Sequence, residues 1–215
     1  PGQMEKWGLG PKEIKQINPS LIYTRISGYG QTGPYSSDPG FASVCEGFGG
    51  FRYVNGEPGE IPVRPNLSLG DTLAGIHAAL GVCMAYIRCL RQGEGKGQVV
   101  DVSIFESVFN MLEAVVPEYS GAGEVREPSG STIKGIVPSN TYRCLDGKLV
   151  IIGANTKGMF ERLMRVIGRD DFADDKRLAI NSERVIHEKA IDEAIAKWVA
   201  TLPLKEVITT LKGQA

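Results

Sequence analysis

The sequence lacks an excess of either charge. Its 215 residues contain 24 Lys and Arg against 25 Asp and Glu, which gives a formal net charge of −1. No basic tract is present that would bind a nucleic acid or an anionic membrane through charge. The composition therefore predicts neither nucleic acid nor membrane as a partner.

Cysteine and histidine are both scarce. The four cysteines form no Cys-x-x-Cys pair and lie near no histidine cluster: Cys45, Cys83, Cys89 and Cys144. This pattern indicates neither a zinc site nor a disulfide framework, so we expect reduced thiols in a cytoplasmic protein, with a mitochondrial location as the alternative. With only two histidines, His77 and His187, a histidine-rich metal site or a Ser-His-Asp triad is not expected.

A long hydrophobic run is missing as well. The longest charge-free stretch with helical spacing runs from Thr72 to Ile87, and a helix that spans a bilayer needs about 20 residues. Apolar residues occupy almost its whole circumference, which predicts a buried helix over 72–87. The chain starts at Pro1-Gly2 rather than at methionine, so we expect it to come from a longer protein, with any targeting segment in the missing part.

The first part of the chain alternates helical and extended patterns, with many glycines between them. A pattern of this kind favours an α/β layer. The expected elements are a helix at 11–17, a strand at 21–27, the buried helix, a strand at 99–103 and a helix at 105–116. Gly93-Glu94-Gly95-Lys96-Gly97 resembles half of a phosphate-binding loop, but it precedes a strand and is predicted to be a turn.

The second part is more helical and contains few glycines. The segments 141–145 and 148–153 flank Asp146-Gly147, which predicts a β-hairpin. Apolar spacing predicts three or four helices, among them 160–167, 191–198 and 204–211. We therefore expect residues 1–117 in an α/β layer, 118–138 as a linker and 139–215 as a small α+β domain.

Gly28-Tyr29-Gly30-Gln31-Thr32-Gly33 follows the first strand and matches the Gly-x-Gly-x-x-Gly pattern of dinucleotide-binding proteins. In that motif a helix is already running at the third glycine, whereas here Pro34 follows at once. We expect a shaped loop that lines a site rather than a site for dinucleotide phosphates.

Asp71 follows Gly70 at the start of the buried helix. This position fits a helix N-cap. It equally fits a nucleophile, because a helix N-terminus stabilises an ionised carboxylate. His77 lies about 240° around the helix from Asp71 and is not expected to be its partner. Lys6 and Trp7 similarly fit two roles each. Lys6 is either a snorkelling surface lysine or a phosphate contact, and Trp7 is either an indole at the edge of the core or a flat surface for a purine.

Several runs of residues together resemble one family. They are Asn18–Tyr23, Gly28–Pro34, Gly70–Gly75 and Gly95–Ser103, followed by Asp146-Gly147, Ile167–Arg169 and Asn181–Arg184. In this order they are similar to the class III CoA-transferases, the family of formyl-CoA transferase and carnitine CoA-transferase. The resemblance covers essentially the whole chain.

The resemblance implies an α/β fold of two domains. Residues 1–117 would be part of a Rossmann-like large domain, and 139–215 would be a small α+β domain. Members of the family are considerably longer than this chain and form interlocked dimers, so we expect an internal fragment of a protein that is a homodimer when full length. Pro1-Gly2 would be the end of an Asn-Phe-Arg-Pro-Gly-like motif.

The resemblance also implies the chemistry and its residues. Asp71 matches the nucleophilic aspartate, which carries coenzyme A from an acyl-CoA to a free carboxylic acid through an aspartyl-CoA intermediate. Gln3, Lys6, Trp7 and Phe41 match positions that contact coenzyme A, although Lys6 stands where an arginine is frequent and loses the bidentate grip on phosphate. Coenzyme A enters as a substrate, and no metal is implied.

The identity of the acyl group stays open. Pro39 and Ala42 occupy positions of polar contacts in formyl-CoA transferase, so formate and oxalate are not expected. Tyr29 and Arg64 are the candidate substrate residues. Arg64 fits the second carboxylate of a dicarboxylate such as succinate, or else is an ordinary exposed loop arginine.

Two other functions remain. Acyl-CoA racemases of this fold carry a histidine base in Gly-His-Asp, but this chain has Gly40-Phe41-Ala42, and phenylalanine takes up no proton. The third possibility is a non-catalytic acyl-CoA-binding protein in which Asp71 only caps its helix. Binding without turnover would distinguish it from the enzyme.

Overall fold

The computed structural model describes residues 1–92 and 95–213. The chain divides into two compact units, Pro1–Pro128 and Ser129–Ala215, and each is described by itself. Part of the turn expected at 93–97 lies outside the described residues, at Gly93 and Glu94.

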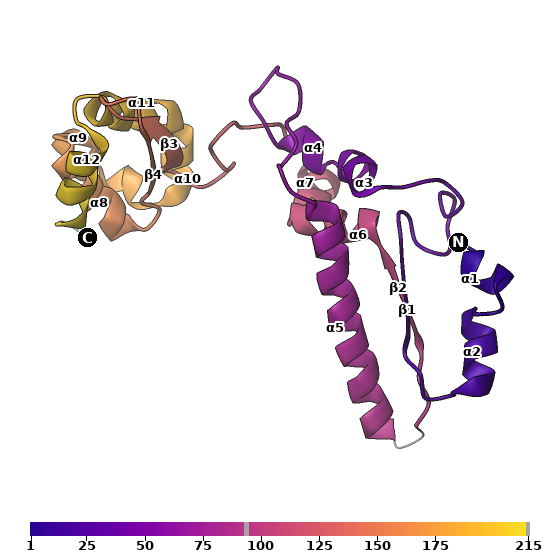
Figure 1. Cartoon of the computed structure of the whole chain (residues 1–215). Coiled ribbons are helices and arrows are strands. Elements are labelled where there is room, and N and C mark those ends of the chain that lie inside the picture. The colour runs from indigo at the N-terminus through magenta and orange to yellow at the C-terminus, as the bar shows by residue number, and fades with distance from the viewer. Residues whose placement is uncertain (93–94, 214–215) are drawn as a thin grey trace. The chain divides into compact units, whose positions relative to one another are not determined.

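The first unit is built on two parallel strands, β1 (Tyr23–Ser27) and β2 (Val99–Ser103), which pair from Tyr23 opposite Val99 to Ser27 opposite Ser103. Parallel neighbours need a crossover connection, and the long helix α5 (Leu69–Gln92) supplies it. It runs alongside both strands in the opposite direction (Figure 1), so its N-terminus lies at their carboxyl ends. These elements confirm the predicted α/β fold.

Shorter helices surround this frame. Two precede β1, namely α1 (Gln3–Lys6) and α2 (Pro11–Ile17), the latter with the predicted bounds. Two others lie between β1 and α5, namely α3 (Ala42–Phe48) and α4 (Phe51–Val54). After β2 come α6 (Ile104–Phe109), the 3-10 turn η1 (Asn110–Leu112) and α7 (Val115–Ala122).

The structure corrects the single helix expected at 105–116. Glu113 has a φ of 54°, in the left-handed region, and this interrupts the helical path between η1 and α7. The last five residues of α7 also lie in the segment expected to be linker from 118 onward. Apolar spacing alone did not reveal the break, because side chains on both sides of Glu113 keep a helical period.

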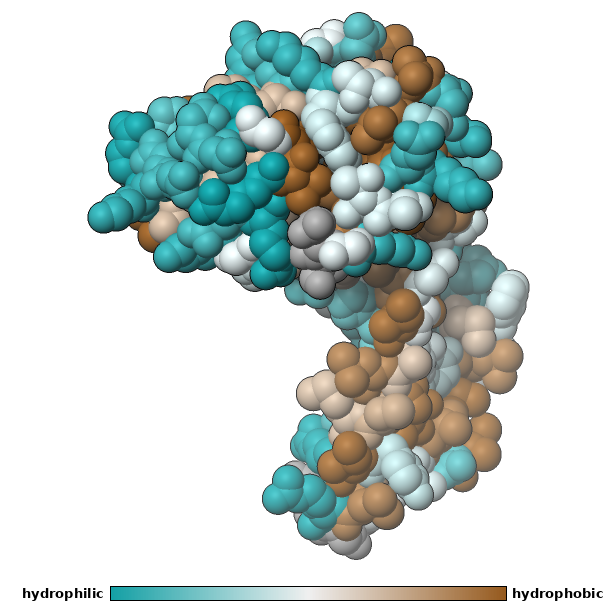
Figure 2. Space-filling view, turned by 90° about the vertical axis from the view of Figure 1, so that its left-hand side faces the viewer, coloured by the Kyte–Doolittle hydropathy of each residue, from teal (hydrophilic) through white to brown (hydrophobic). Residues whose placement is uncertain are grey.

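The structure also corrects the expected burial of the long helix. One face of α5 packs on β1, β2 and α6 through small residues such as Ala74, Ala78 and Ala85. The opposite face exposes Ile76, Leu80, Met84, Ile87 and Leu90 (brown, lower part of Figure 2). A helix that is apolar all round is buried only where neighbouring elements cover every side. The described residues cover one side of α5.

The length of α5 is a further correction. The helix continues past the charge-free run, and Leu69–Arg91 is long and apolar enough, by length and composition only, to cross a membrane. The prediction took the charge-free run from Thr72 to Ile87 as the whole apolar length and judged it too short for a bilayer. The helix is longer than this run, so that prediction is wrong.

The second unit contains the predicted hairpin. The strands β3 (Ser139–Arg143) and β4 (Leu149–Gly153) pair in antiparallel fashion. Both strands differ by one or two residues from the predicted bounds, because the turn is wider: the Cys144 N–H donates to the Lys148 carbonyl at 2.8 Å and the Gly147 N–H to the Cys144 carbonyl at 2.9 Å. Gly147 has a φ of 77°, which explains why glycine stands there.

Helices follow the hairpin and cover it. The three that were predicted individually are present as α8 (Lys157–Val166), α11 (Glu188–Val199) and α12 (Leu204–Lys212). Between α8 and α11 lie α9 (Asp170–Ala173), the 3-10 turn η2 (Lys176–Ala179) and α10 (Asn181–Ile186), more elements than expected. The shared core includes Phe160, Met164, Ile191, Ile195 and Val207, each at 1% exposure or less.

Candidate active site

The loop after β1 is held against the carboxyl ends of both strands. The Gly28 carbonyl accepts the Phe105 N–H at 3.0 Å and the Ser103 hydroxyl at 3.1 Å. Further along, the Gln31 N–H donates to the Asp101 carboxylate at 2.9 Å. No helix forms between the end of β1 at Ser27 and the start of α3 at Ala42, so the 28–33 loop is not a dinucleotide fingerprint, as predicted. It occupies the edge of the sheet where α/β proteins bind ligands.

Three glycines bring separate segments into close contact here. A Cβ atom on Gly28 would lie 2.6 Å from the Gly40 Cα, and one on Gly40 would lie 3.2 Å from the Cys45 Sγ. A Cβ atom on Gly70 would lie 3.1 Å from the Ala42 Cβ. The loop, the start of α3 and the start of α5 therefore meet, and the neighbours of Ala42 and Gly70 in the chain are Phe41 and Asp71.

Asp71 is the third residue of α5, and the helix begins at Leu69. The Ser68 carbonyl accepts both the Thr72 N–H at 3.0 Å and the Thr72 hydroxyl at 2.8 Å, so the first turn begins before Asp71 and includes it. The interpretation of Asp71 as the N-cap is wrong. As a first-turn acid it still benefits from the helix dipole.

The Asp71 carboxylate is exposed, and within residues 1–92 and 95–213 it makes no hydrogen bond or ion pair. Its charge reaches the neighbouring buried thiol: burial first, and then the negative charges of Asp71 and Glu46, raise the pKa of Cys45. The carboxylate is therefore oriented toward open space at the junction of loop, α3 and α5. An exposed acid at this position is available to a substrate.

Glu46 is a residue of this region that the sequence reasoning missed. It lies on α3 with 0% exposure. One carboxylate oxygen accepts the Gly70 N–H at 3.2 Å, and the other pairs with Arg52 Nε at 2.8 Å. The available signal was an acid as the one charged residue of its helix, followed six residues later by an arginine.

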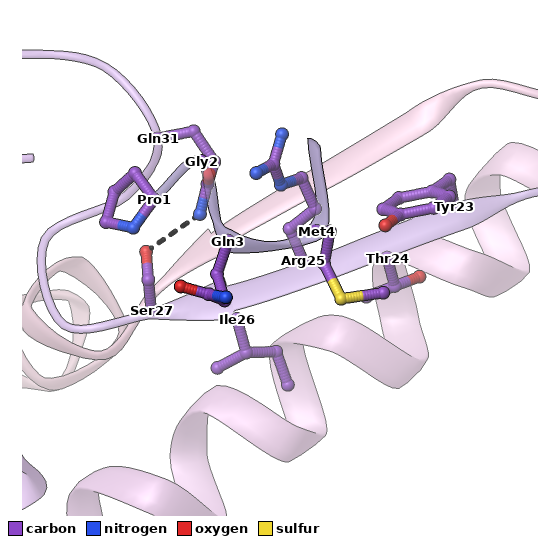
Figure 3. A pocket seen from close by; sticks show the side chains of 10 residues that line it. All are labelled: Pro1, Gly2, Gln3, Met4, Tyr23, Thr24, Arg25, Ile26, Ser27 and Gln31. Carbon is purple, nitrogen blue, oxygen red and sulfur yellow. Dashed lines mark hydrogen bonds between the residues drawn. The ribbon is translucent and has the colours of Figure 1, made fainter. Parts of the chain in front are cut away.

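A cavity of about 310 Å³ lies beside β1 and includes Gln3 in its lining (Figure 3). Gln31 of the glycine loop lines the same cavity, and its side-chain amide donates to the Ser27 hydroxyl at 3.2 Å. The Gln31 Oε1 is buried, and the structure, over the part of the chain it describes, gives it no hydrogen-bond donor. The cavity thus connects Gln3 with the loop that leads to the Asp71 region.

The remaining candidate residues are more dispersed. Trp7 and Phe41 are 63% and 80% exposed, and Lys6 and Arg64 are exposed as well. Phe41 directly precedes α3, but neither Lys6 nor Trp7 belongs to the lining of the cavity beside Gln3.

Tyr29 lies in a group of aromatic rings with Tyr35, Phe48 and Phe105, at centroid distances of 5.4 to 6.3 Å. Burial in this group raises the pKa of the Tyr29 phenol. Among the described residues there is no cluster of three or more His, Cys, Asp or Glu side chains that would hold a metal ion.

Comparison with known proteins decides the family. The family model of CoA-transferase family III matches residues 1–215. The chain belongs to this family. This is the family that the resemblance of its motifs implied, and its α/β architecture agrees with that of the solved CAIB/BAIF family proteins.

Individual proteins are similar over nearly the whole chain. It is 43% identical over 198 residues to succinyl-CoA–D-citramalate CoA-transferase of Chloroflexus aurantiacus, covering 92% of this chain and 49% of that protein. It is 29% identical over 212 residues to succinate–glutarate CoA-transferase of Agrobacterium fabrum, covering 99% and 52%. A solved CAIB/BAIF family protein from Brucella suis superposes with a TM-score of 0.78 at 29% identity, covering 99% and 55%. The chain spans about half the length of the relatives it matches.

Proposed function

We propose that the full-length protein is a CoA-transferase that moves coenzyme A from an acyl-CoA thioester to a free carboxylic acid, with Asp71 as nucleophile. The observation that carries this proposal is the exposed Asp71 carboxylate, in the first turn of α5 and at the carboxyl ends of the parallel strands. Membership of CoA-transferase family III and the relatives that transfer CoA between acids support it.

The reaction divides one exchange into steps at a single carboxylate. An Asp71 oxygen attacks the thioester carbonyl carbon, the C–S bond breaks, and coenzyme A leaves as the thiolate, which gives a mixed anhydride. The thiolate then attacks the Asp71 carbonyl carbon and displaces the donor carboxylate, which leaves an aspartyl-CoA thioester. The acceptor carboxylate repeats these two steps in reverse, so Asp71 is regenerated and the new acyl-CoA departs.

The geometry restricts which amide groups stabilise the oxyanions of these steps. The Gly70 and Thr72 N–H groups already donate to Glu46 and Ser68, and the Gln31 N–H donates to Asp101. These three amides are occupied. We propose that the donors are other amides of the 28–33 loop or groups from elsewhere in the full-length protein.

We propose that coenzyme A lies along the surface from Gln3 and Lys6 on α1, and Trp7 directly after it, to Phe41 before α3. The exposed rings of Trp7 and Phe41 offer flat faces to an adenine, and Lys6 offers a charge to phosphate. The cavity that joins Gln3 to the glycine loop supports this path.

We propose succinyl-CoA as the donor, because the similar Chloroflexus aurantiacus enzymes are named succinyl-CoA CoA-transferases. Arg64 is exposed on the segment that leads into α5, where a guanidinium is able to bind the distal carboxylate of a dicarboxylate. Transfer to a panel of acids by the full-length protein and by Arg64→Leu, followed by mass spectrometry, tests this assignment. Equal rates for mono- and dicarboxylates would contradict it.

We propose that the protein acts as a dimer in a reducing compartment such as the cytoplasm. All four cysteines are free thiols in the structure. Two relatives are named as alpha and beta subunits of succinyl-CoA–L-malate CoA-transferase, so the partner is either a second copy or a similar chain. Sedimentation shows whether the full-length protein expressed alone forms a dimer. Purification from the native source shows whether a second, similar chain accompanies it.

The decisive test is the Asp71→Asn variant of the full-length protein. The amide keeps the size of the side chain but forms no anhydride, so we expect turnover to fall by orders of magnitude. Wild-type protein incubated with succinyl-CoA and hydroxylamine should carry an Asp71 hydroxamate, detected by peptide mass spectrometry. Because Asp71 is not the N-cap, Asp71→Ala should cost only about 0.3–1 kcal/mol of stability.

Two results would contradict the proposal. Wild-type turnover in Asp71→Asn would remove Asp71 from the mechanism. Tight acyl-CoA binding without turnover in the wild type would favour the non-catalytic binding protein. The racemase is disfavoured because Phe41, at the position of its histidine base, takes up no proton.

A further inference from the structure

Glu46 forms a buried connection between three helices of the first unit. Its side chain is fully buried on α3, and its two carboxylate oxygens bond in different directions. One accepts the Gly70 N–H in the first turn of α5 at 3.2 Å, and the other accepts Arg52 Nε from α4 at 2.8 Å. The Arg52 Nη2 also donates to the Ser43 hydroxyl at 3.0 Å, back on α3. A buried charge is stable only when it is paired and hydrogen-bonded in this way.

This connection ends one residue from Asp71. Gly70 directly precedes Asp71. The Gly70 Cα is closely packed, since a Cβ added to it would lie 3.1 Å from both Ala42 Cβ and Ile104 Cγ2. The turn that carries Asp71 is therefore fixed by packing on one side and by the Glu46 hydrogen bond on the other. Neither Glu46 nor Arg52 is exposed enough to contact a substrate, at 0% and 18% of the side chain.

We propose that Glu46 and Arg52 are positioning residues for Asp71. Glu46 fixes the first turn of α5 through Gly70, and Arg52 holds Glu46 in place and neutralises its charge beside the reacting carboxylate. This inference rests on the proposed function, in which Asp71 is the nucleophile.

Each partner has a distinct effect on the reaction. Without the Glu46 hydrogen bond the first turn of α5 loses its anchor, and a displacement of about 1 Å at a reacting group costs about 100-fold in rate. Without Arg52 the turn remains anchored, but a buried negative charge is left unpaired next to a site where thiolates and oxyanions form. That charge repels them. Both effects act on kcat, because neither residue contacts coenzyme A.

The experiment uses the full-length protein with succinyl-CoA. For each variant we would measure kcat, KM, the melting temperature and the single-turnover rate of hydroxamate formation at Asp71. For Glu46→Ala and Arg52→Met we expect kcat and the trapping rate to fall by about 10- to 100-fold, with KM within about twofold of wild type. Arg52→Lys retains a positive charge opposite Glu46 and should recover most of the rate.

A double variant tests the role of charge and remains informative if Glu46→Ala fails to fold. In Glu46→Gln/Arg52→Met the amide oxygen still accepts the Gly70 N–H and no charge is buried. We expect this protein to turn over faster than Arg52→Met alone. A double variant that is as slow as Arg52→Met would contradict the proposed role of charge.

Arg126→Met is the matched control, since Arg126 lies in the same unit, has the same 18% side-chain exposure as Arg52 and pairs with Glu118. It should lower the melting temperature without changing kcat. If the Glu46 and Arg52 variants behave like this control, with Asp71 trapped at the wild-type rate, the positioning role is overturned while the proposed function stands. If wild-type protein gives no Asp71 adduct, the proposed function itself fails.

Discussion

The two units bury their apolar side chains to very different degrees. In Ser129–Ala215 the hairpin and the helices enclose a continuous core around Phe160, Met164 and Ile195. In Pro1–Pro128 the core around Ala74, Ala78 and Val102 is small, and the long helix α5 leaves one apolar face exposed. A parallel sheet is normally covered on both faces. The elements of the second unit thus bury their apolar side chains against one another, whereas the described residues of the first unit leave an apolar face of α5 uncovered.

One hydrogen-bonded carboxylate in each unit shows the same contrast. In the second unit, Asp192 accepts the Tyr142 hydroxyl at 2.6 Å and the Asn140 amide at 2.8 Å, which joins β3 to α11. In the first unit, Glu46 joins α3, α4 and α5 beside Asp71. The Asp192 carboxylate serves the packing of a closed core, and the Glu46 carboxylate stabilises a turn at the candidate active site.

The largest expected difference concerns independent folding. Residues 129–215 expressed alone should unfold in a cooperative thermal transition. Residues 1–128, and also the 215-residue chain, should aggregate or bind a hydrophobic dye, because α5 exposes a contiguous apolar face. Calorimetry and light scattering measure both outcomes. A soluble monomer of 1–128 with a sharp melting transition would contradict the difference between the two units.

A smaller effect is expected within the core of the second unit. Phe160 is 1% exposed, so Phe160→Ala should lower the free energy of unfolding of residues 129–215 by about 3–5 kcal/mol. Met159 is its neighbour on α8 and is 41% exposed, so Met159→Ala should cost less than about 1 kcal/mol. Urea unfolding measures the two values. Similar values would show that the core is less well packed than its burial indicates.

The smallest effect concerns acid stability of the second unit. Hydrogen bonds from the Arg177 side chain and backbone N–H lower the pKa of Asp175 from 3.8 to about 2. Because the folded-state pKa lies below the unfolded one, this stabilisation is present above about pH 4 and is lost as the pH falls toward 2. The melting temperatures of wild type and Asp175→Asn should therefore differ at pH 5 and converge near pH 2. A constant difference would show that the ionised carboxylate contributes nothing.

Local patterns predicted most elements of both units. Pro11 at a first helical position marked α2, and Asp146-Gly147 between two extended runs marked the β3–β4 hairpin. Motif order identified the family. The patterns failed where the cause was not local, as at Glu113, where a left-handed residue divides one apparent helix into two.

The sequence proposed candidate residues for the site but not their arrangement in space. Asp71 was identified from the sequence, but its place in the first turn, after a helix start at Leu69, was not. Glu46 and Arg52 were missed, since their pairing depends on how α3 and α4 fold back on α5.

The sequence by itself determined the helical and extended periods, the glycine turns and the family, because these depend on residues close together in the chain. Only the tertiary structure decided which apolar faces are buried, which amides near Asp71 are already occupied, and that Glu46 accepts a hydrogen bond from the turn that carries Asp71. Burial and hydrogen bonding depend on segments that approach from distant positions in the chain. The spacing of residues along the sequence does not specify which segments these are.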